Sequence, residues 1–362
     1  MEREKSGLCL ITFSNNADHQ NVVYSMFNAL HGKTEVYSFG IRDPKSSIAP
    51  HTEDNYYFDC PLRPGIEKKT FRLDVIWKMA RLIRKKGISC LYFESMHLWN
   101  LFLMLFCPGV KKVVVIHDVI PHDQSKAVSL CTALSCKMAD HIVIRNQKYK
   151  EALIQNFKIK SEKITCLELW RYFPKQRPVT HSQKYLYFGR IRKYKGIDAL
   201  ISIVEKTPEI TYQVVGCPDE ECKPLMSYLK QSLKNVDVID WEVSDGEMEE
   251  MFTQADWIIL PYASATQSGV IVDAYKYSRP VIAFDVGAIS EQVEDGETGF
   301  LVPANDEGAF CEAIRKTAEF TEEELCRFSE NAYRFGFSRY AAEGAADGFL
   351  QFIRKKQRRK TR

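Results

Sequence analysis

Two successive series of short apolar runs, separated by longer amphipathic stretches, constrain the fold of this chain most strongly. Apolar runs of this length, rich in β-branched and aromatic residues, are typical of parallel strands that crossover helices bury on both faces. The alternation therefore predicts an α/β chain with two Rossmann-like sheets. The first series lies at 7–13, 33–40, 88–94, 111–118 and 141–146, and the second at 184–190, 211–216, 236–241, 256–262, 279–285 and 298–303.

The interruption between the two series predicts a domain boundary. The segment 170–183 is rich in Pro and polar residues, and a chain of 362 residues is too long for one ordinary hydrophobic core. We therefore expect an N-terminal domain at 1–172 and a C-terminal domain at 183–335. The remaining segment, 336–362, is expected to be a helix and a basic tail that packs back on the N-terminal domain.

Composition narrows the functional classes. The chain has 50 basic and 47 acidic residues, so its net charge of +3 gives no global attraction to nucleic acid. Eleven cysteines, an odd number without a CxxC pair, argue against a disulfide framework or a zinc ribbon and favour a reducing cytoplasm. The apolar stretch at 98–107 is shorter than the about 18 residues that span a bilayer. No membrane-spanning segment is expected.

Cations follow the first strand of the second series. The loop "FGRIRKYKG" leaves that strand at Gly189 and carries four cations, including Arg190 and Lys195, before a helix begins. Ligands of open α/β sheets bind at the carboxyl ends of strands. A guanidinium can bind two phosphate oxygens, and an ammonium adds a point charge. We expect Arg190 and Lys195 to bind a diphosphate, with a solvated basic loop as the alternative.

A second strand-end loop lies within "SATQSGVIVDAY" at 264–275. The loop is predicted to expose the backbone N–H groups of Ser268, Gly269 and Val270 at the positive end of a helix. Gly269 has no Cβ, so an anion can approach it closely. The sequence therefore predicts a second part of an anion site here, although a packing turn with a serine cap explains the same residues.

Polar side chains accompany this loop and the next one. Thr266 and Gln267 can form hydrogen bonds with neutral polar atoms of a ligand, and Asp273, about one helical turn after Gly269, can accept from a ribose diol. Glu291, after the apolar run at 279–285, is either a ligand carboxylate or a cap for backbone amides. These residues complete the predicted ligand-binding set of the C-terminal domain.

The ordered motifs "FGRIRKYKG", "VVG", "ADWIILPYASATQSGVIVDAY", "RPVIAFDVGAISE" and "DGETGFLVP" resemble the C-terminal domain of retaining glycosyltransferases of family four. The resemblance covers about 184–317. It implies the GT-B fold, in which two Rossmann-like domains face each other across an interdomain cleft. It also implies that the C-terminal domain binds a nucleotide-diphosphate sugar, with Arg190 and Lys195 on the diphosphate and Asp273 on the ribose, while the N-terminal domain binds the acceptor.

One departure concerns two glutamates that many family members have at the positions of Ala265 and Asp273. The "ATQSG" form resembles a variant of the family in which the first carboxylate, which faces the sugar, is absent. Thr266 or Gln267 is expected to supply polar contacts to the sugar instead. In the first domain, "TFSNNADHQN" replaces the usual glycine-rich loop.

The N-terminal half is similar to the family only in pattern, through "VVVIHD" and "ADHIVIRN". The resemblance implies that His117, at a strand end, contacts the transferred sugar. A metal site of His117 with Asp118, His122 and Asp123, or a structural histidine, is the alternative. In the strand-end loop at 94–99, Glu94 or His97 is expected to help form the acceptor site.

The expected function is transfer of a sugar, with retention, from a nucleotide-diphosphate donor to a hydroxyl of a saccharide or lipid-linked saccharide acceptor. The leaving phosphate is expected to accept the acceptor's proton, and no cofactor or metal is expected. Surface polysaccharide or glycoconjugate synthesis is the expected setting. A sugar-nucleotide epimerase of the same fold and a non-catalytic nucleotide-sugar-binding protein are the alternatives.

Two cationic segments suggest attachment to a membrane surface. The predicted helix at 73–86 carries five cations near Trp77 and Leu82, and the end of the chain at 354–362 carries seven cations and no acid. A solvated basic surface is the simpler alternative for both segments. We expect a cytoplasmic protein, peripheral at the inner face of the cell membrane.

Overall fold

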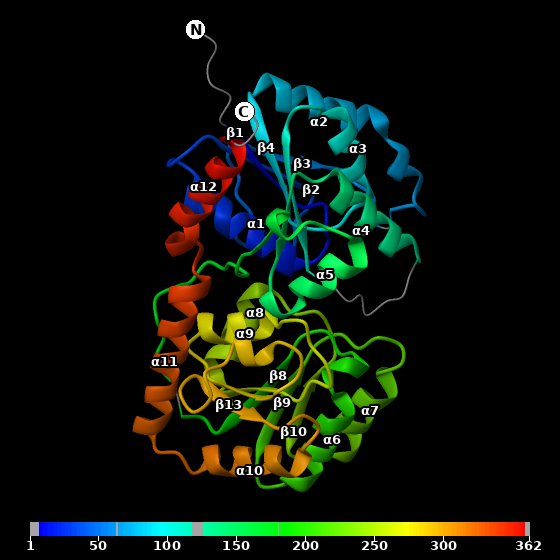
Figure 1. Ribbon diagram of the computed structural model, residues 1–362. Helices are drawn as coiled ribbons and strands as arrows, with labels where there is room; N and C mark the ends of the chain where they lie inside the picture. The colour runs from blue at the N-terminus through cyan, green and yellow to red at the C-terminus, as the bar shows by residue number, and fades with distance from the viewer. Residues whose placement is uncertain (1–6, 63, 118–125, 180, 359–362) are drawn as a thin grey trace. The chain divides into compact units, whose positions relative to one another are not determined.

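The computed structural model describes residues 7–62, 64–117, 126–179 and 181–358 (Figure 1). They form two compact units. Unit 1 comprises Met1–Tyr172 and Ala341–Arg362, and unit 2 comprises Phe173–Tyr340. The chain therefore leaves unit 1 once and returns to it with its final helix.

Unit 1 contains a seven-stranded parallel sheet with strand order β3-β2-β1-β4-β5-β6-β7. Its strands are β1 (Gly7–Ile11), β2 (Val36–Ile41), β3 (Asn55–Phe58), β4 (Ile88–Phe93), β5 (Lys111–Ile116), β6 (His141–Ile144) and β7 (Ile164–Cys166). Its α-helices are α1 (Ala17–Leu30), α2 (Leu73–Lys85), α3 (Leu98–Phe106), α4 (Lys126–Met138), α5 (Lys150–Phe157) and α12 (Ala342–Arg358). Short 3₁₀ turns lie at η1 (Lys68–Phe71), η2 (Gln147–Tyr149) and η3 (Ser161–Lys163).

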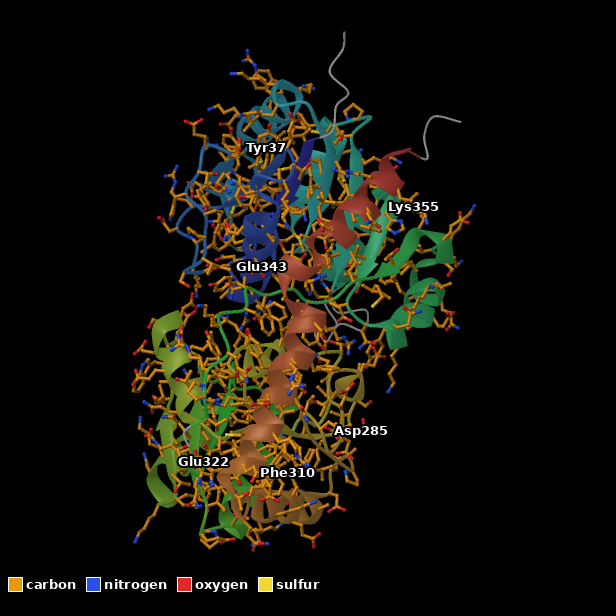
Figure 2. All side chains as sticks on the ribbon, turned by 90° about the vertical axis from the view of Figure 1, so that its left-hand side faces the viewer. Tyr37, Asp285, Phe310, Glu322, Glu343 and Lys355 are labelled. Atoms are coloured by element: carbon orange, nitrogen blue, oxygen red, sulfur yellow. The ribbon has the colours of Figure 1, made fainter. Side chains whose placement is uncertain are left out.

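Packing of the last helix helps to close the core of unit 1. Helix α12 lies beside α1 and contacts β4 (Figure 1). The ring of Phe349 on α12 meets Tyr92 edge to face, with centroids 5.2 Å apart, and Trp170 at 5.0 Å. Such aromatic pairs add directional contacts to the apolar area that they bury. Lys355, near the C-terminal end of α12, is exposed (Figure 2).

Unit 2 contains a six-stranded parallel sheet with strand order β10-β9-β8-β11-β12-β13. Its strands are β8 (Lys184–Phe188), β9 (Thr211–Val215), β10 (Val236–Ile239), β11 (Trp257–Leu260), β12 (Val281–Phe284) and β13 (Gly299–Val302). Its α-helices are α6 (Ile197–Lys206), α7 (Lys223–Ser232), α8 (Asp245–Gln254), α9 (Gly269–Lys276), α10 (Glu307–Ala318) and α11 (Glu322–Tyr340). Two 3₁₀ turns lie at η4 (Lys193–Lys195) and η5 (Ile289–Glu291).

Aromatic side chains fill the core of unit 2. Phe310 of α10 is fully buried (Figure 2) and packs edge to face on Phe284, with centroids 4.9 Å apart. Trp257 of β11 packs on Phe300 and Phe328. Helix α11 packs against α9. The central strands β11 (WIIL) and β12 (VIAF) are apolar and buried throughout, as expected of strands covered on both faces.

Both sheets reverse their strand order between two neighbouring strands, β1 and β4 in unit 1 and β8 and β11 in unit 2. The loops that leave these strands diverge, so open α/β sheets bind ligands at this switch point. All eleven predicted runs contain a strand, which confirms the expected fold class for each sheet. No helix in the described ranges has both the length and the apolar composition needed to cross a bilayer.

Candidate functional site

The two predicted loops of unit 2 are joined at its switch point. Gly196 adopts a left-handed conformation with φ of 74°, and a Cβ there would lie 1.7 Å from the carbonyl oxygen of Pro261. The amides of Ala263 and Ser264 donate to the Tyr194 carbonyl at 2.9 and 3.3 Å. Only glycine allows this approach, because an L side chain would meet backbone. The loop after β8 therefore lies directly on the loop after β11.

Lys195 projects its ammonium to the end of β8. Its Nζ lies 5.3 Å from the ring centroid of Tyr262. A Cβ on Gly189 would lie 3.0 Å from that Nζ and 3.5 Å from Val270 Cγ2, so the ammonium lies near the first turn of α9. The hydroxyl of Tyr187 donates to the Lys195 carbonyl at 3.1 Å and fixes the backbone. The positive charge of Lys195 therefore lies near the N-terminus of α9.

The other cations of the loop have different surroundings. Arg192 lies 3.6 Å from Asp219. Lys193 donates to both carboxylate oxygens of Asp198 at 2.9 Å. Arg190 is exposed, and within the described residues no acid pairs with it. Two of the four cations are therefore committed to acids of unit 2, whereas Arg190 has its guanidinium available to an external anion.

The start of α9 differs from its predicted form at Ser268. The Ser268 N–H donates to Gln292 Oε1 at 2.7 Å, and Gln292 Nε2 donates to the Ser268 carbonyl at 3.1 Å. The predicted exposure of that amide is therefore wrong, because a buried glutamine side chain binds it. The Ser268 hydroxyl does not cap the helix, and it is buried without a hydrogen-bond partner in the described part of the chain. Gly269 and Val270 then supply the first amides of the helix.

The remaining predicted residues lie around this loop with different exposures. Thr266 and Asp273 are each 8% exposed, so only small parts of them can meet a ligand. Gln267 is half-buried beside them. Glu291 is half-buried in η5, and its carbonyl accepts from Arg339. The predicted residues therefore lie in one region of unit 2. Their side chains are less exposed to solvent than the sequence pattern suggested.

Tyr262 was missed by the sequence analysis. Its side chain is buried, its ring carries the Lys195 ammonium, and its hydroxyl has no hydrogen-bond partner among the described residues. An aromatic ring attracts a cation through its negative face. The only signal in the sequence was an aromatic residue directly after an apolar run, and that pattern is common in cores.

Unit 1 holds a second polar cluster at the carboxyl ends of its strands. Arg145, after β6, places Nη2 at 2.5 Å from both carboxylate oxygens of Glu94, after β4, and both side chains are fully buried. His117, after β5, donates from Nε2 to the Glu94 carbonyl at 2.8 Å and lies 3.0 Å from its Oε1. Burial alone would raise the pKa of Glu94, but Arg145 and His117 outweigh it and lower the pKa to about 2. Glu94 is therefore ionised.

A second histidine lies against His117. The two ring centroids of His19 and His117 are 4.5 Å apart, and His19 Nδ1 is 2.9 Å from the Ser14 hydroxyl. Burial, with the neighbouring His117, lowers the pKa of His19 to about 3. His19 is neutral near pH 7 and can supply a hydrogen bond without adding a charge to the buried pair.

Other polar residues of unit 1 have structural roles. His97 accepts from the Trp99 N–H and donates to the Pro61 carbonyl, so both ring nitrogens are occupied and its predicted acceptor contact is wrong. Asn16 caps α1. Asp18 forms an ion pair with Arg171. The other three residues of the alternative metal site, Asp118, His122 and Asp123, lie outside the described residues.

One known family resembles the second unit. Residues 182–319 match the family model described as Glycosyl transferases group 1. The matched residues all lie in unit 2, which is therefore similar to glycosyltransferase group 1 domains. The chain is also 27% identical over 177 residues to D-inositol 3-phosphate glycosyltransferase 2 of Catenulispora acidiphila, which covers 44% of this chain and 41% of that relative. The chain spans less than half the length of the curated relatives that it matches first.

Solved structures with the same fold extend over nearly the whole chain. Sucrose-phosphate synthase from Thermosynechococcus elongatus has a TM-score of 0.75 at 18% identity and covers 97% of this chain and 98% of its own. Anabaena Alr3699/HepE, solved with UDP and glucose, has a TM-score of 0.76 at 13% identity and covers 96% and 99%. These likenesses confirm the predicted GT-B fold class.

Proposed function

We propose that the chain is a retaining glycosyltransferase that moves a sugar from a nucleotide-diphosphate donor to an acceptor hydroxyl. One observation carries this proposal: the Lys195 ammonium lies near the first turn of α9, between the two loops of the unit 2 switch point. Arg190, exposed at the start of the same loop, adds a guanidinium. Anions bind at helix N-termini, and fixed cations strengthen that binding.

The reaction separates charge, and the site is built to compensate it. When the bond from the sugar to the diphosphate breaks, negative charge grows on the leaving phosphate oxygens. Arg190, Lys195 and the amides of Gly269 and Val270 then stabilise the transition state more than the ground state. Because these groups neutralise the diphosphate, we propose that no metal ion is required. The leaving phosphate accepts the proton of the acceptor hydroxyl on the face where the new bond forms, which retains the anomeric configuration.

Other residues receive roles by the same reasoning. We propose that Asp273 accepts hydrogen bonds from the ribose, that Thr266, Gln267 or Glu291 contacts the sugar, and that His117 contacts the transferred sugar from unit 1. The Glu94–Arg145 pair is fully buried, so it positions His117 rather than binding substrate.

We propose a saccharide or lipid-linked saccharide acceptor, used in surface polysaccharide or glycoconjugate synthesis. A lipid-linked acceptor lies at a membrane surface, so the proposal includes peripheral attachment at the cytoplasmic face. Exposed cations support this attachment by their charge, among them Arg84 on α2 and Lys355 at the end of α12 (Figure 2).

Incubation of the pure protein with a panel of nucleotide sugars tests the proposed function. We expect nucleotide release that depends on an added saccharide acceptor. Release of the free sugar with inversion would contradict retention. Isomerised donor without an acceptor would indicate an epimerase, and binding without turnover would indicate a sensor. Any of these three outcomes would reject the proposal.

The ring of Tyr262 is expected to contribute to donor binding through Lys195. Tyr262→Leu removes the aromatic face that holds the ammonium and is expected to raise the KM for the donor about 3- to 30-fold. Tyr262→Phe keeps that face and serves as the control, with a KM close to that of the wild type. Steady-state kinetics with the active donor measures both. Equal KM values for the Leu and Phe variants would show that the ring has no such role.

A further inference from the structure

Unit 1 carries an unusual concentration of exposed apolar side chains. Twelve large hydrophobic residues are exposed in the described part of the chain, and five of them fall within sixteen consecutive residues, the segment 62–77. Scattered exposed apolar residues are normal, but a cluster of this kind marks an interaction site. The five exposed fractions are 57% for Leu62, 81% for Ile66, 67% for Phe71, 47% for Leu73 and 48% for Trp77.

The described residues of the segment 62–77, which are 62 and 64–77, are anchored by hydrogen bonds to buried groups. The carbonyl of Pro61, directly before it, accepts from His97, and the carbonyl of the fully buried Thr70 accepts from Trp99 Nε1 at 2.9 Å. The Gly65 N–H donates to the Thr70 hydroxyl at 2.9 Å. Because its base is anchored at these points, the exposed side chains do not reflect a loose loop. They are presented on a fixed support.

Helix α2 follows directly on η1 along the chain and carries the last two of the five exposed residues. Its buried face is apolar (Ile76, Met79 and Ile83 lie on it), and α2 packs on α3 and β4 (Figure 1). Leu73 and Trp77 are four residues apart, so they share another face of the helix, and both are exposed. The Arg81 guanidinium, one turn further on, lies 5.5 Å from the Trp77 ring centroid. An apolar stripe is thus bordered by cations.

Charge in this region is opposite to that of the rest of the chain. The sequence from 62 to 85 contains eight cationic and two acidic residues, a net charge of +6. The whole chain carries +3, so all other residues together carry −3. The two acids are Glu67 and Asp74, and Asp74 forms an ion pair with Arg72. The cations and the exposed apolar side chains therefore coincide on one short stretch of unit 1.

We propose that the segment 62–77, with the exposed face of α2, is the surface by which unit 1 docks on an anionic lipid bilayer. Apolar side chains of this face enter the region between headgroups and acyl chains, and the surrounding cations bind lipid phosphates. Three of the five apolar residues are aliphatic, which favours hydrocarbon over the stacked bases of a nucleic acid. The inference deepens the proposed function, because it rests on an acceptor held in a membrane.

Sedimentation with lipid vesicles tests the proposal. The full-length protein is mixed with vesicles of phosphatidylcholine, with or without one third of phosphatidylglycerol. We expect binding to the anionic vesicles that weakens as salt is added. The double variant Ile66→Ser/Phe71→Ser is expected to lower the partition coefficient for anionic vesicles about tenfold or more. Two large apolar side chains are then no longer transferred from water into the bilayer. Unchanged thermal unfolding checks that these exposed changes leave unit 1 folded.

Trp77 and Trp241 form a matched pair for the same assay. Trp241, in unit 2, is 54% exposed and has Lys230 5.9 Å from its ring centroid, which is close to the surroundings of Trp77. Trp77→Ser is expected to weaken vesicle binding several-fold, whereas Trp241→Ser leaves it unchanged. Equal effects of the two changes, or loss of binding only in Arg354→Ser/Lys355→Ser, would overturn the assignment of the docking surface.

Failure of docking can be told apart from failure of the proposed function. Nucleotide release with a soluble saccharide acceptor is measured in parallel, without vesicles. If the wild-type protein releases nucleotide but does not bind anionic vesicles, the docking proposal is wrong and the transferase proposal stands. If it binds vesicles through the segment 62–77 but transfers no sugar, docking stands and the transferase proposal falls. Saturable binding of a protein or nucleic acid at Trp77 in place of vesicles would also overturn docking.

Discussion

Lys195→Ala is expected to lower kcat by about 10²- to 10³-fold while the protein stays folded. Removal of one preorganised donor to a developing oxyanion has this size of effect, because water cannot replace a fixed charge in the transition state. The Lys195 ammonium lies close to Gly189 and Val270, where the leaving phosphate is placed by the proposal. Arg190→Ala is expected to lower kcat in the same direction. Steady-state kinetics with the active donor, together with thermal unfolding, measures both changes.

Lys193 provides a control on the same turn. Its ammonium donates to Asp198 at 2.9 Å on both oxygens, so it is directed away from the proposed phosphate position. Lys193→Ala removes the same charge from η4 and is expected to leave kcat within about twofold, because distant exposed charges are screened. If Lys193→Ala and Lys195→Ala reduced kcat equally, general charge rather than position would explain the effect. The assigned role of Lys195 would then be wrong.

Arg145→Met is expected to destabilise the folded state by about 3–5 kcal/mol, because it leaves the fully buried Glu94 carboxylate without its counter-ion. Methionine fills a similar volume, so the loss reports charge rather than a large cavity. Urea unfolding followed by near-ultraviolet circular dichroism measures it. Glu94→Leu in the same chain removes the stranded carboxylate, so the double variant is expected to recover much of the lost stability.

The acid dependence of stability is expected to change sign in Arg145→Met. In the wild type the pKa of Glu94 lies at about 2, below its ordinary value of 4.5. Its contribution is therefore present above about pH 4.5 and is lost as the pH falls towards 2. Without Arg145, burial dominates and raises the pKa of Glu94, so ionisation now costs stability as the pH rises. Parallel acid dependence in the two proteins would contradict the ion-pair account.

The central strands and the site loops of unit 2 were predictable because local sequence determines them. Short apolar runs such as those within 256–262 and 279–285 are typical of strands buried on both faces. Each run ends in residues that turn away from the sheet, so β11 stops at Leu260 and leaves Tyr262 in the loop. Edge strands carry a weaker signal. β3 is "NYYF", half-buried throughout, and β7 has three residues, so neither was predicted.

Contacts between distant parts of the chain could not be predicted from local sequence. Gln292, from another loop, accepts a hydrogen bond from the Ser268 amide, and no residue within "ATQSG" indicates this contact. The Glu94–Arg145 pair joins residues 51 positions apart, and either residue alone is typical of a solvated strand end. The same is true of His97, whose sequence position suggested a ligand contact but whose ring nitrogens bind Pro61 and Trp99. Tertiary partners decide these roles.

The most direct test of the account is the affinity for a nucleoside diphosphate relative to its monophosphate, measured by titration calorimetry on the wild type, Lys195→Ala and Lys193→Ala. With UDP and UMP, or GDP and GMP for a guanosine-binding site, the wild type is expected to bind the diphosphate about tenfold or more tightly, since a charge-assisted hydrogen bond to the second phosphate is gained. The account predicts that this preference collapses in Lys195→Ala and survives in Lys193→Ala. An undiminished preference in Lys195→Ala would contradict it.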